Sequence, residues 1–510
     1  MTLRVRVWLA LICLGALALR IGLALNVDFP GVADPNHYYN LAVRLIDGHG
    51  FTIDYIWQYS ADPASIVHPE EHWMPLAAAL AALPMALFGV SVQAAISPFI
   101  LIGSVLPVLA FIGARRLSLS DEGALFAAAA VAFLPELVLN SLRTDTTIPF
   151  ALFTSAALLL AARLTPLRAV GVGVLAGLAY LTRSDGALIL AVFACVVVFN
   201  GEFSLSWRPI RLIPIAVIAY VVVILPWLVR NLDAFGAFTS PETRIMWYFT
   251  HHDDHYAYGR TFSLETLLAA QTPAEIAGKR LFEMAAGGVM MLRAFGDALA
   301  VAVIGGLLLI AARRDRSAAR MIAPALVFVG IAFLAYTLLL PYKAQAGSLK
   351  KAFLGAAPLL IPLAALALDR VIADRRIRRG AMALIVIVLA VNAVQLVRTD
   401  SAASVAYLAG VERAAAVART LPDTNDDGDI ILMTQDPFII RYVGLRSIMY
   451  PYEDRDTIHA AALRYGVDYL LMPANRPSLN ALYEGEDADP RFIFAADVPG
   501  TPFCFFRVTP

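Results

Sequence analysis

The sequence predicts an α-helical polytopic membrane protein with a small α/β domain at its C-terminal end. The chain of 510 residues is 59% hydrophobic and 16% charged, with a mean hydropathy of +0.70, which is too apolar for an ordinary soluble protein. Apolar runs of about 20 residues, long enough to cross a hydrocarbon core of roughly 30 Å, recur until about residue 398 and then stop. The two parts of the predicted fold follow from this change of composition.

The apolar runs predict about eleven membrane spans. The first, at residues 7–26, lacks a small-residue cleavage site, so we interpret it as a retained helix and not as a signal peptide. Residues 74–88 are interrupted by Pro75 and Pro84 and are expected to lie along or dip into the outer face instead of crossing. The other ten spans are expected at 94–114, 122–140, 147–163, 168–182, 186–200, 211–229, 287–312, 321–341, 352–371 and 380–398.

Loop charges predict the orientation of these spans in the plasma membrane. Arginines concentrate in every second connection, most densely at 370–379, and such loops lie on the cytoplasmic side of membrane proteins. The N-terminus is therefore expected in the cytoplasm, and residues 27–73, 141–146, 230–286 and those after 397 outside. We expect a membrane domain at 1–398, whose first outer loop covers 27–93, and an extracytoplasmic domain at 399–510.

The last 110 or so residues show the pattern of a small α/β domain. Short stretches rich in β-branched and aromatic residues are expected to form strands at 430–433, 469–472, 492–496 and 503–508. Helical segments are expected between them at 405–420 and 457–465.

Charge balance and cysteine content exclude several classes of protein. Lys+Arg and Asp+Glu number 40 each, so the formal net charge is zero and nothing indicates a nucleic-acid partner. The three cysteines, Cys13, Cys195 and Cys504, form neither a disulfide framework nor a metal-ligand spacing. The chain also lacks the Gly-Lys-Ser/Thr phosphate loop and the Gly-x-Ser-x-Gly elbow, so nucleotide-driven transport and α/β-hydrolase chemistry lose their usual support.

Ionisable side chains gather on the predicted outer side, where they suggest a reaction site. Asp34 follows the first span, where it could act as a general base or instead cap the helix that begins at Pro35. Asp145 lies in the very short second outer connection. It could likewise belong to the reaction site or instead cap a helix. Four cations could bind a phosphate or a lipid headgroup, and they are Arg183, Arg230, Lys343 and Lys350.

One histidine-rich segment could hold a divalent cation. His252, Asp253 and Asp254 belong to the densest set of potential metal ligands, although contiguous residues cannot all face one ion. The alternative is a polar loop that folds over the site. No other cofactor is expected.

The order of these motifs resembles the polytopic GT-C glycosyltransferases, in the bacterial branch related to protein O-mannosyltransferases, lipid A aminoarabinose transferases and the lipopolysaccharide-core transferases of rhizobia. This branch often has His-Pro-Pro or Lys-Pro-Pro where this chain has His72-Trp73-Met74-Pro75. The matching stretches are Asp34 with Tyr38 and Tyr39, Pro75-Leu76 with 87–89, Asp145 before Pro149-Phe150, 176–183, 226–236 and 466–471.

The resemblance implies an integral-membrane glycosyltransferase that takes a sugar from a polyprenyl-phosphate donor at the extracytoplasmic face. It implies that Asp34 is the base or orients the acceptor, and that Asp145 assists. The acceptor is left open between protein, lipid and polysaccharide. The residues expected to contact substrates are Tyr38, Tyr39, His72, Trp227 and Tyr256.

Two other functions stay open from the sequence. A lipid-linked sugar transporter or flippase would show mid-membrane charges and inverted repeats, whereas here the charges lie at the outer ends of the spans and no repeat is visible. A polysaccharide polymerase or ligase would share the donor but would carry its large outer loop late in the chain, and here the early loop is the elaborate one.

Overall fold

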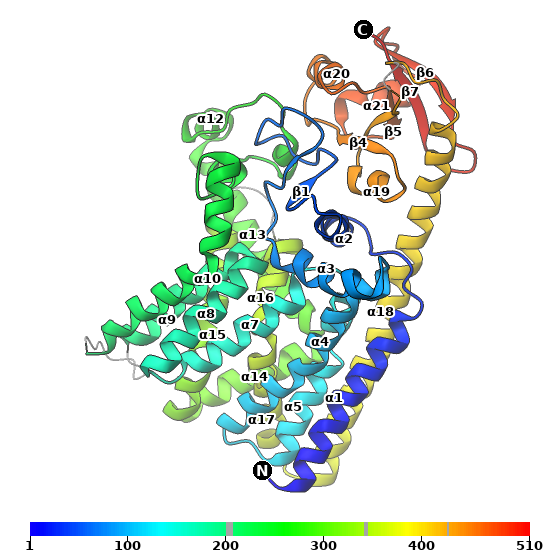
Figure 1. Ribbon diagram of the computed structural model, residues 1–510. Helices are drawn as coiled ribbons and strands as arrows, with labels where there is room; N and C mark the ends of the chain where they lie inside the picture. The colour runs from blue at the N-terminus through cyan, green and yellow to red at the C-terminus, as the bar shows by residue number, and fades with distance from the viewer. Residues whose placement is uncertain (200–207, 341–344, 426–427) are drawn as a thin grey trace. The chain divides into compact units, whose positions relative to one another are not determined.

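The computed structural model describes residues 1–199, 208–340, 345–425 and 428–510 (Figure 1). The chain divides into two compact units. The helical unit comprises Met1–Asp28, Met74–Arg230 and Ala274–Thr399, and the sheet unit comprises Phe29–Trp73, Asn231–Pro273 and Asp400–Pro510. Each is described by itself below.

The helical unit is built from apolar helices joined by short connections. Its main helices are α1 (Leu3–Ala24), α3 (Leu76–Phe88), α4 (Val92–Arg116), α5 (Asp121–Ala132), α6 (Pro135–Asn140), α7 (Thr147–Ala161), α8 (Pro166–Thr182), α9 (Leu188–Val198), α10 (Leu212–Phe235), α13 (Pro273–Phe295), α14 (Asp297–Arg313), α15 (Arg316–Leu334), α16 (Lys350–Leu360), α17 (Pro362–Val371) and the first part of α18 (Arg375–Ala418). Within the unit, α4 packs against α1, α3, α5 and α7, and α7 packs against α8 and α16.

Length and composition confirm a multi-pass membrane protein. Within the described ranges, 5 helices are long and apolar enough to cross a membrane, or up to 7 if each of two bent helix pairs counts as one span. The single helix expected at 122–140 is instead two helices, because the chain breaks between Ala132 and Pro135, where proline cannot supply a backbone N–H. The span expected at 352–371 is likewise bent by 47° at Pro362.

A buried arginine closes the break between α5 and α6. Arg20 on α1 is fully buried and donates hydrogen bonds to the carbonyl oxygen of Ala132 at 2.9 Å and to Ser141 Oγ at 3.0 Å. An interrupted helix leaves carbonyls that lipid cannot satisfy, so an internal donor is needed there. Gly103 on α4 makes room for this contact, because a Cβ atom at that position would lie 2.2 Å from Ser141 Oγ.

Gly103→Ala is therefore expected to destabilise the protein by about 1–3 kcal/mol, the usual cost of overpacking. Thermal unfolding of the purified protein in detergent measures the effect. Gly22→Ala is the matched control, because a Cβ atom at Gly22 on α1 meets nothing within 4 Å. Equal melting temperatures for the two variants would contradict this account of Arg20 and Ser141.

The sheet unit holds a five-stranded mixed sheet of order β4-β3-β5-β7-β6. β3 is parallel to both β4 and β5, and β7 is antiparallel to β5 and β6. Its elements include α2 (Asp34–Ile46), β1 (Thr52–Ile53), β2 (His68–Pro69), α11 (Pro241–Ile245), α12 (Leu264–Ala270), β3 (Ile431–Thr434), α19 (Pro437–Tyr442), β4 (Arg446–Met449), α20 (Arg455–Arg464), β5 (Tyr469–Met472), α21 (Pro477–Tyr483), β6 (Phe492–Asp497) and β7 (Cys504–Val508).

The four strands expected from sequence are confirmed to within a residue or so, but β4 was missed. β4 has the sequence Arg-Ser-Ile-Met, which lacks the alternation that marks a half-buried strand. The helix expected at 405–420 is the end of α18, a single helix of 44 residues. No break separates it from the span at 380–398, because residues 399–404 contain neither proline nor glycine.

The first loop of the sheet unit, Phe29–Trp73, is fixed to β4 and to α20. Ile56 forms a parallel bridge with Ile448, donates its N–H to Ser447 O and accepts a hydrogen bond from Met449 N at 2.8 Å, so it covers the exposed edge of β4. Further along the first loop, Arg464 pairs with Asp62 at 2.5 Å. The segment Phe29–Trp73 is therefore an ordered part of the unit.

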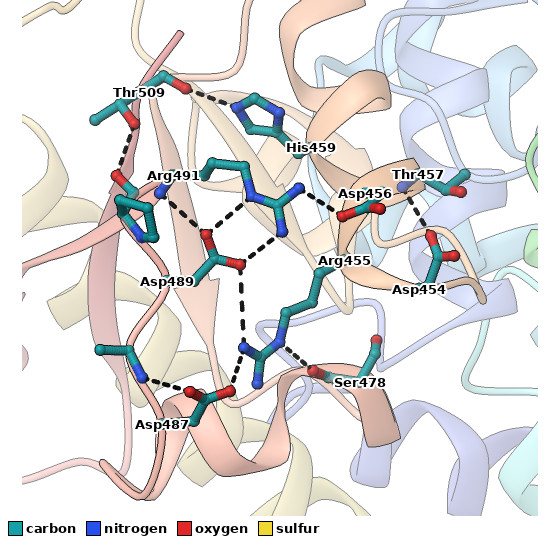
Figure 2. Close-up of polar contacts among 12 residues, drawn as sticks. Asp454, Arg455, Asp456, Thr457, His459, Ser478, Asp487, Asp489, Arg491 and Thr509 are labelled. Carbon is teal, nitrogen blue, oxygen red and sulfur yellow. Dashed lines mark hydrogen bonds and ion pairs between the residues drawn. The ribbon is translucent and has the colours of Figure 1, made fainter.

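An ion-pair network joins α20 and α21 to the β6–β7 end of the sheet (Figure 2). Arg455 pairs with Asp487 at 2.6 Å and donates to Ser478 O, while Arg491 pairs with Asp456 at 2.6 Å and with Asp489 at 2.7 Å. The Arg491 hydrogen bonds lower the pKa of Asp489 to about 2. All these groups are paired with one another, so we interpret the network as structural.

Candidate functional site

A carboxylate and a lysine form a buried pair in the helical unit. The Oδ1 atom of Asp145 accepts hydrogen bonds from the N–H and the hydroxyl of Thr147 at 3.1 and 3.2 Å, and its Oδ2 atom lies 2.8 Å from Lys351 Nζ. Asp145 is 2% exposed. Burial alone would raise its pKa, but the Lys351 ammonium and these hydrogen bonds hold it well below the usual value. Asp145 is therefore an anion that positions Lys351.

Arg183 lies beside this pair in its own network. Its Nη2 and Nε atoms contact Asp185 Oδ2 at 2.9 and 3.1 Å, and the Tyr336 hydroxyl donates to Asp185 Oδ1 at 2.5 Å. Burial opposes the charge, yet the carboxylates of Asp185 and Asp145 raise the pKa of Arg183 above its usual value. Arg183 is thus held as a fixed cation, and none of the described residues accepts a hydrogen bond from its Nη1 atom.

The other predicted cations have different surroundings. Lys350 pairs with Glu136 at 3.2 Å, at a more exposed position than Lys351. The Arg230 guanidinium lies 4.7 Å from the ring centre of Trp227. Lys343 lies outside the described residues.

Asp34 occupies the first position of α2 in the sheet unit. The N-cap residue is Ala33, with φ 61°, so Asp34 does not cap the helix as the alternative interpretation proposed. The helix itself is held rigidly, because Asn40 donates to Asn36 Oδ1 at 3.0 Å and to Phe438 O at 2.8 Å. Asp34 is half-buried and is therefore accessible at the end of a fixed helix.

The Asp34 carboxylate lies near enough to the Tyr256 hydroxyl to affect its pKa. Burial, together with the negative charges of Asp253 and Asp34, raises the pKa of Tyr256 to about 12. The guanidinium of Arg476 lies 5.3 Å from the Tyr256 ring centre, and Arg476 is 1% exposed. The structure thus brings Asp34 and Tyr256 into one environment, together with Arg476, which no pattern in the sequence predicts.

The two other predicted tyrosines are buried in aromatic contacts. Tyr38 is 1% exposed and its ring lies 5.9 Å from that of Trp73. Tyr39 is 7% exposed, lies 5.7 Å from the Tyr442 ring, and burial raises its pKa to about 12. Such positions favour packing, so substrate contact by either residue stays a prediction.

His72 binds a glutamate that sequence reasoning missed. Glu242 is fully buried and its two carboxylate oxygens contact Nδ1 of His72 and Nδ1 of His255. Burial lowers the pKa of His72 to about 3 and that of His255 to about 4. Glu242 lies about 170 positions after His72, so only the tertiary structure could bring them together.

The three predicted metal ligands do not converge. The Asp254 Oδ2 atom accepts the N–H groups of Thr250 and His251 at 2.7 and 3.0 Å, whereas Asp253 lies 3.5 Å from the His252 ring. In the part of the chain that the structure describes, no group of three or more His, Cys, Asp or Glu side chains could hold a metal ion. His252, Asp253 and Asp254 therefore do not fit the expected divalent cation.

Neighbouring glutamates of the first loop have opposite electrostatic roles. The Glu70 Oε1 atom accepts the N–H groups of His72 and Trp73 at 2.9 and 2.8 Å, and its Oε2 atom lies 3.1 Å from His37 Nε2. Although burial opposes the charge, these contacts lower the pKa of Glu70 to about 2. Burial and the negative charge of Glu70 instead raise the pKa of Glu71 well above its usual value.

Glu70→Gln should lower the free energy of unfolding at pH 7 by about 1.5–3 kcal/mol, the usual range for hydrogen bonds to a charged group. Because the folded-state pKa is depressed, this stabilisation is present above about pH 4.5 and is lost as the pH falls through about 2. The difference from wild type should therefore shrink on acidification. Thermal unfolding between pH 7 and 3 measures it. Glu71→Gln should act in the opposite direction, because the raised pKa of Glu71 costs the wild type stability above about pH 4.5, where the unfolded chain ionises this group. This variant should therefore gain stability relative to wild type as the pH rises to 7 and match it near pH 3.

Comparisons with known proteins agree with this architecture. Residues 67–229 match the family model of the dolichyl-phosphate-mannose-protein mannosyltransferases, which is less than half of the chain. No curated protein matches the chain in sequence.

Two solved structures share the fold. ArnT from Cupriavidus metallidurans, solved bound to undecaprenyl phosphate, has a TM-score of 0.59 and 16% identity, with 99% of both chains covered. The archaeal oligosaccharyltransferase AglB from Archaeoglobus fulgidus, in complex with an inhibitory peptide and a dolichol-phosphate, has a TM-score of 0.58 and 15% identity, covering 92% of this chain and 70% of that one. The family model over residues 67–229 and the shared fold agree with the resemblance to GT-C glycosyltransferases seen in the sequence.

Proposed function

We propose that the protein transfers a sugar from a polyprenyl-phosphate donor to an acceptor hydroxyl at the extracytoplasmic face of the plasma membrane. The observation that carries the proposal is the fixed cation Arg183, placed beside the Asp145–Lys351 pair in a unit whose sequence matches a family named for a dolichyl-phosphate sugar. A lipid-linked donor keeps its tail in the bilayer, which explains why most of the chain is apolar helix.

The cations of the helical unit supply the donor-phosphate site in this proposal. The C–O bond between the anomeric carbon and the phosphate breaks, and negative charge develops on the departing polyprenyl phosphate. The unused Nη1 edge of Arg183, together with Lys350 and Arg230, stabilises that charge. Asp145 acts indirectly, since its two oxygens are occupied by Thr147 and Lys351.

Asp34 is the base in this proposal. As the acceptor oxygen attacks the anomeric carbon, its proton passes to the Asp34 carboxylate. Two features support Asp34 in this role: it is half-buried, and it occupies the first position of a helix that Asn40 holds in place. His72, Trp227 and Tyr256 remain candidates for contact with the substrates.

The proposed topology keeps the eleven spans, the cytoplasmic N-terminus and the domains 1–398 and 399–510. Short apolar helices such as α7 and α8 support spans beyond those that pass a length test, and the basic loops support the orientation. Residues 74–88, which contain α3, are proposed not to cross, because basic loops alternate with the other spans only if this segment stays on the outer face.

A panel of radiolabelled polyprenyl-phosphate sugars tests the proposal. The purified protein in nanodiscs is incubated with each donor and a crude envelope acceptor, and release of polyprenyl phosphate is measured by thin-layer chromatography. We expect one donor to be consumed, and Asp34→Asn to abolish its consumption. Donor that crosses the membrane of proteoliposomes without losing its sugar would instead establish the transport alternative.

A further inference from the structure

A cavity of about 490 Å³ lies in the sheet unit, at the carboxyl ends of two parallel strands. Gln435 follows β3 directly, residues 473–475 follow β5 directly, and both segments line the cavity. The cavity is large enough for a small-molecule ligand, whose sites usually measure roughly 300–1,000 Å³.

The position of the cavity coincides with a topological switch point. After β3 the chain turns toward β4 on one side, and after β5 it continues through α21 toward β6 on the other. Where neighbouring parallel strands send their connections in opposite directions, the loops part and leave a crevice, which is where open α/β sheets bind ligands. The strand order thus gives a physical reason for the cavity.

Two further elements enclose the crevice. Residues Ala406, Tyr407, Gly410 and Arg413 of α18 follow the spacing of one helix face and line one wall. The β6–β7 connection, residues 500–503, lines another, because Cys504 at the start of β7 pairs with Met472 at the end of β5.

The lining combines planar polar groups with aromatic faces. In the described ranges, no hydrogen bond occupies the side-chain amides of Asn475 and Asn480, and Gln435 accepts only the N–H of Asn475, at 3.3 Å. Tyr407 and Phe503 contribute rings that lie 6.3 Å apart. Amides offer a donor and an acceptor side by side, which suits neighbouring hydroxyls, and apolar rings suit the C–H face of a sugar.

Arg413 adds a single positive charge to this lining. Its Nη1 atom donates to Gly500 O at 3.1 Å and its Nε atom to Ala409 O at 3.2 Å, so the guanidinium is oriented by its own domain. Among the described residues, no carboxylate lines the cavity itself, and the neighbouring Asp436 carboxylate accepts a hydrogen bond from the Tyr407 hydroxyl. An acidic substituent on a ligand would therefore meet a complementary charge.

We propose that this cavity is a saccharide-binding site that holds a sugar unit of the acceptor, with a preference for acidic sugars. The role as acceptor site rests on the proposed glycosyltransferase function, but binding itself does not. The cavity uses none of the residues assigned above to the reaction, so binding and transfer can be measured separately.

Ligand-observed saturation-transfer NMR on the full-length protein in nanodiscs tests the proposal, with methyl β-D-glucuronoside and methyl β-D-glucoside as probes. We expect both to bind and the glucuronoside to bind about tenfold more tightly, which is the ratio that 1.4 kcal/mol gives. Arg413→Gln should remove this ratio while both probes still bind.

Ala406→Trp should abolish binding by filling the cavity, whereas Val405→Trp, an exposed neighbour on α18 outside the lining, should leave it unchanged. If Ala406→Trp impairs folding, the pair Asn475→Ala and Asn480→Ala is used, with at least a tenfold loss expected. Asp34→Asn should bind both probes normally, which separates this site from the proposed reaction. Failure of wild type to bind either probe, or equal binding by Ala406→Trp, overturns the proposal.

Discussion

We expect Asp34→Asn to lower the rate of the proposed sugar transfer by about 10²–10⁴-fold, the usual contribution of a positioned general base, while the protein folds and melts as wild type. The amide keeps the shape of the carboxylate and its place at the start of α2, but it cannot take the acceptor proton. Transfer from the donor found in the panel, measured in single-turnover experiments, gives the rate directly.

The matched control for this variant is Asp47→Asn. Asp47 is an exposed aspartate at the other end of the same helix, so the change in net charge is the same. It should transfer sugar at the wild-type rate. Full activity of Asp34→Asn would refute the assignment of the base while leaving the glycosyltransferase assignment intact.

Lys351→Met has the largest expected effect on stability, a loss of about 3–5 kcal/mol, because it removes the ammonium group that lies 2.8 Å from the buried Asp145 carboxylate. Transfer should also fall, since Asp145 and Lys351 lie beside the proposed phosphate site. Adding Asp145→Asn should restore much of the lost stability, because the amide carries no charge to bury. Thermal unfolding in detergent measures all three proteins.

Lys350→Met serves as the matched control for stability. The adjacent lysine pairs with Glu136 at a position where the two side chains are 32% and 21% exposed, and such pairs contribute roughly 0–1 kcal/mol. A smaller shift in melting temperature is therefore expected. Equal shifts in melting temperature for the two lysine variants would show that the Asp145–Lys351 pair does not make the predicted contribution to stability.

The two lysines also show what the sequence could not predict, namely which of them faces Asp145. The basic segment around the start of α16 predicts Lys350 as a phosphate-binding cation, but Lys351 is the residue that contacts Asp145. Adjacent residues on a helix point about 100° apart, so the rotation of α16 decides which one faces inward. A sequence without a known partner helix cannot fix that rotation.

Arg183 and Asp185 illustrate the opposite situation. They are two positions apart, so the pairing could have been proposed from the sequence once a sharp turn was expected after α8. The third member, Tyr336, comes from the π-helical segment Ala335–Leu339 that follows α15, about 150 positions later. The sequence can therefore predict the local ion pair of Arg183 and Asp185, but not their remote partner Tyr336.

The sequence by itself determined the membrane class, the C-terminal α/β domain and the set of ionisable segments, because hydropathy, charge and strand patterns are local properties of the chain. The tertiary structure alone decided that Lys351 pairs with Asp145, that Glu242 lies between His72 and His255, and that a cavity opens between β3 and β5. Each of these depends on residues far apart in the chain, whose approach is set by helix rotation and strand order.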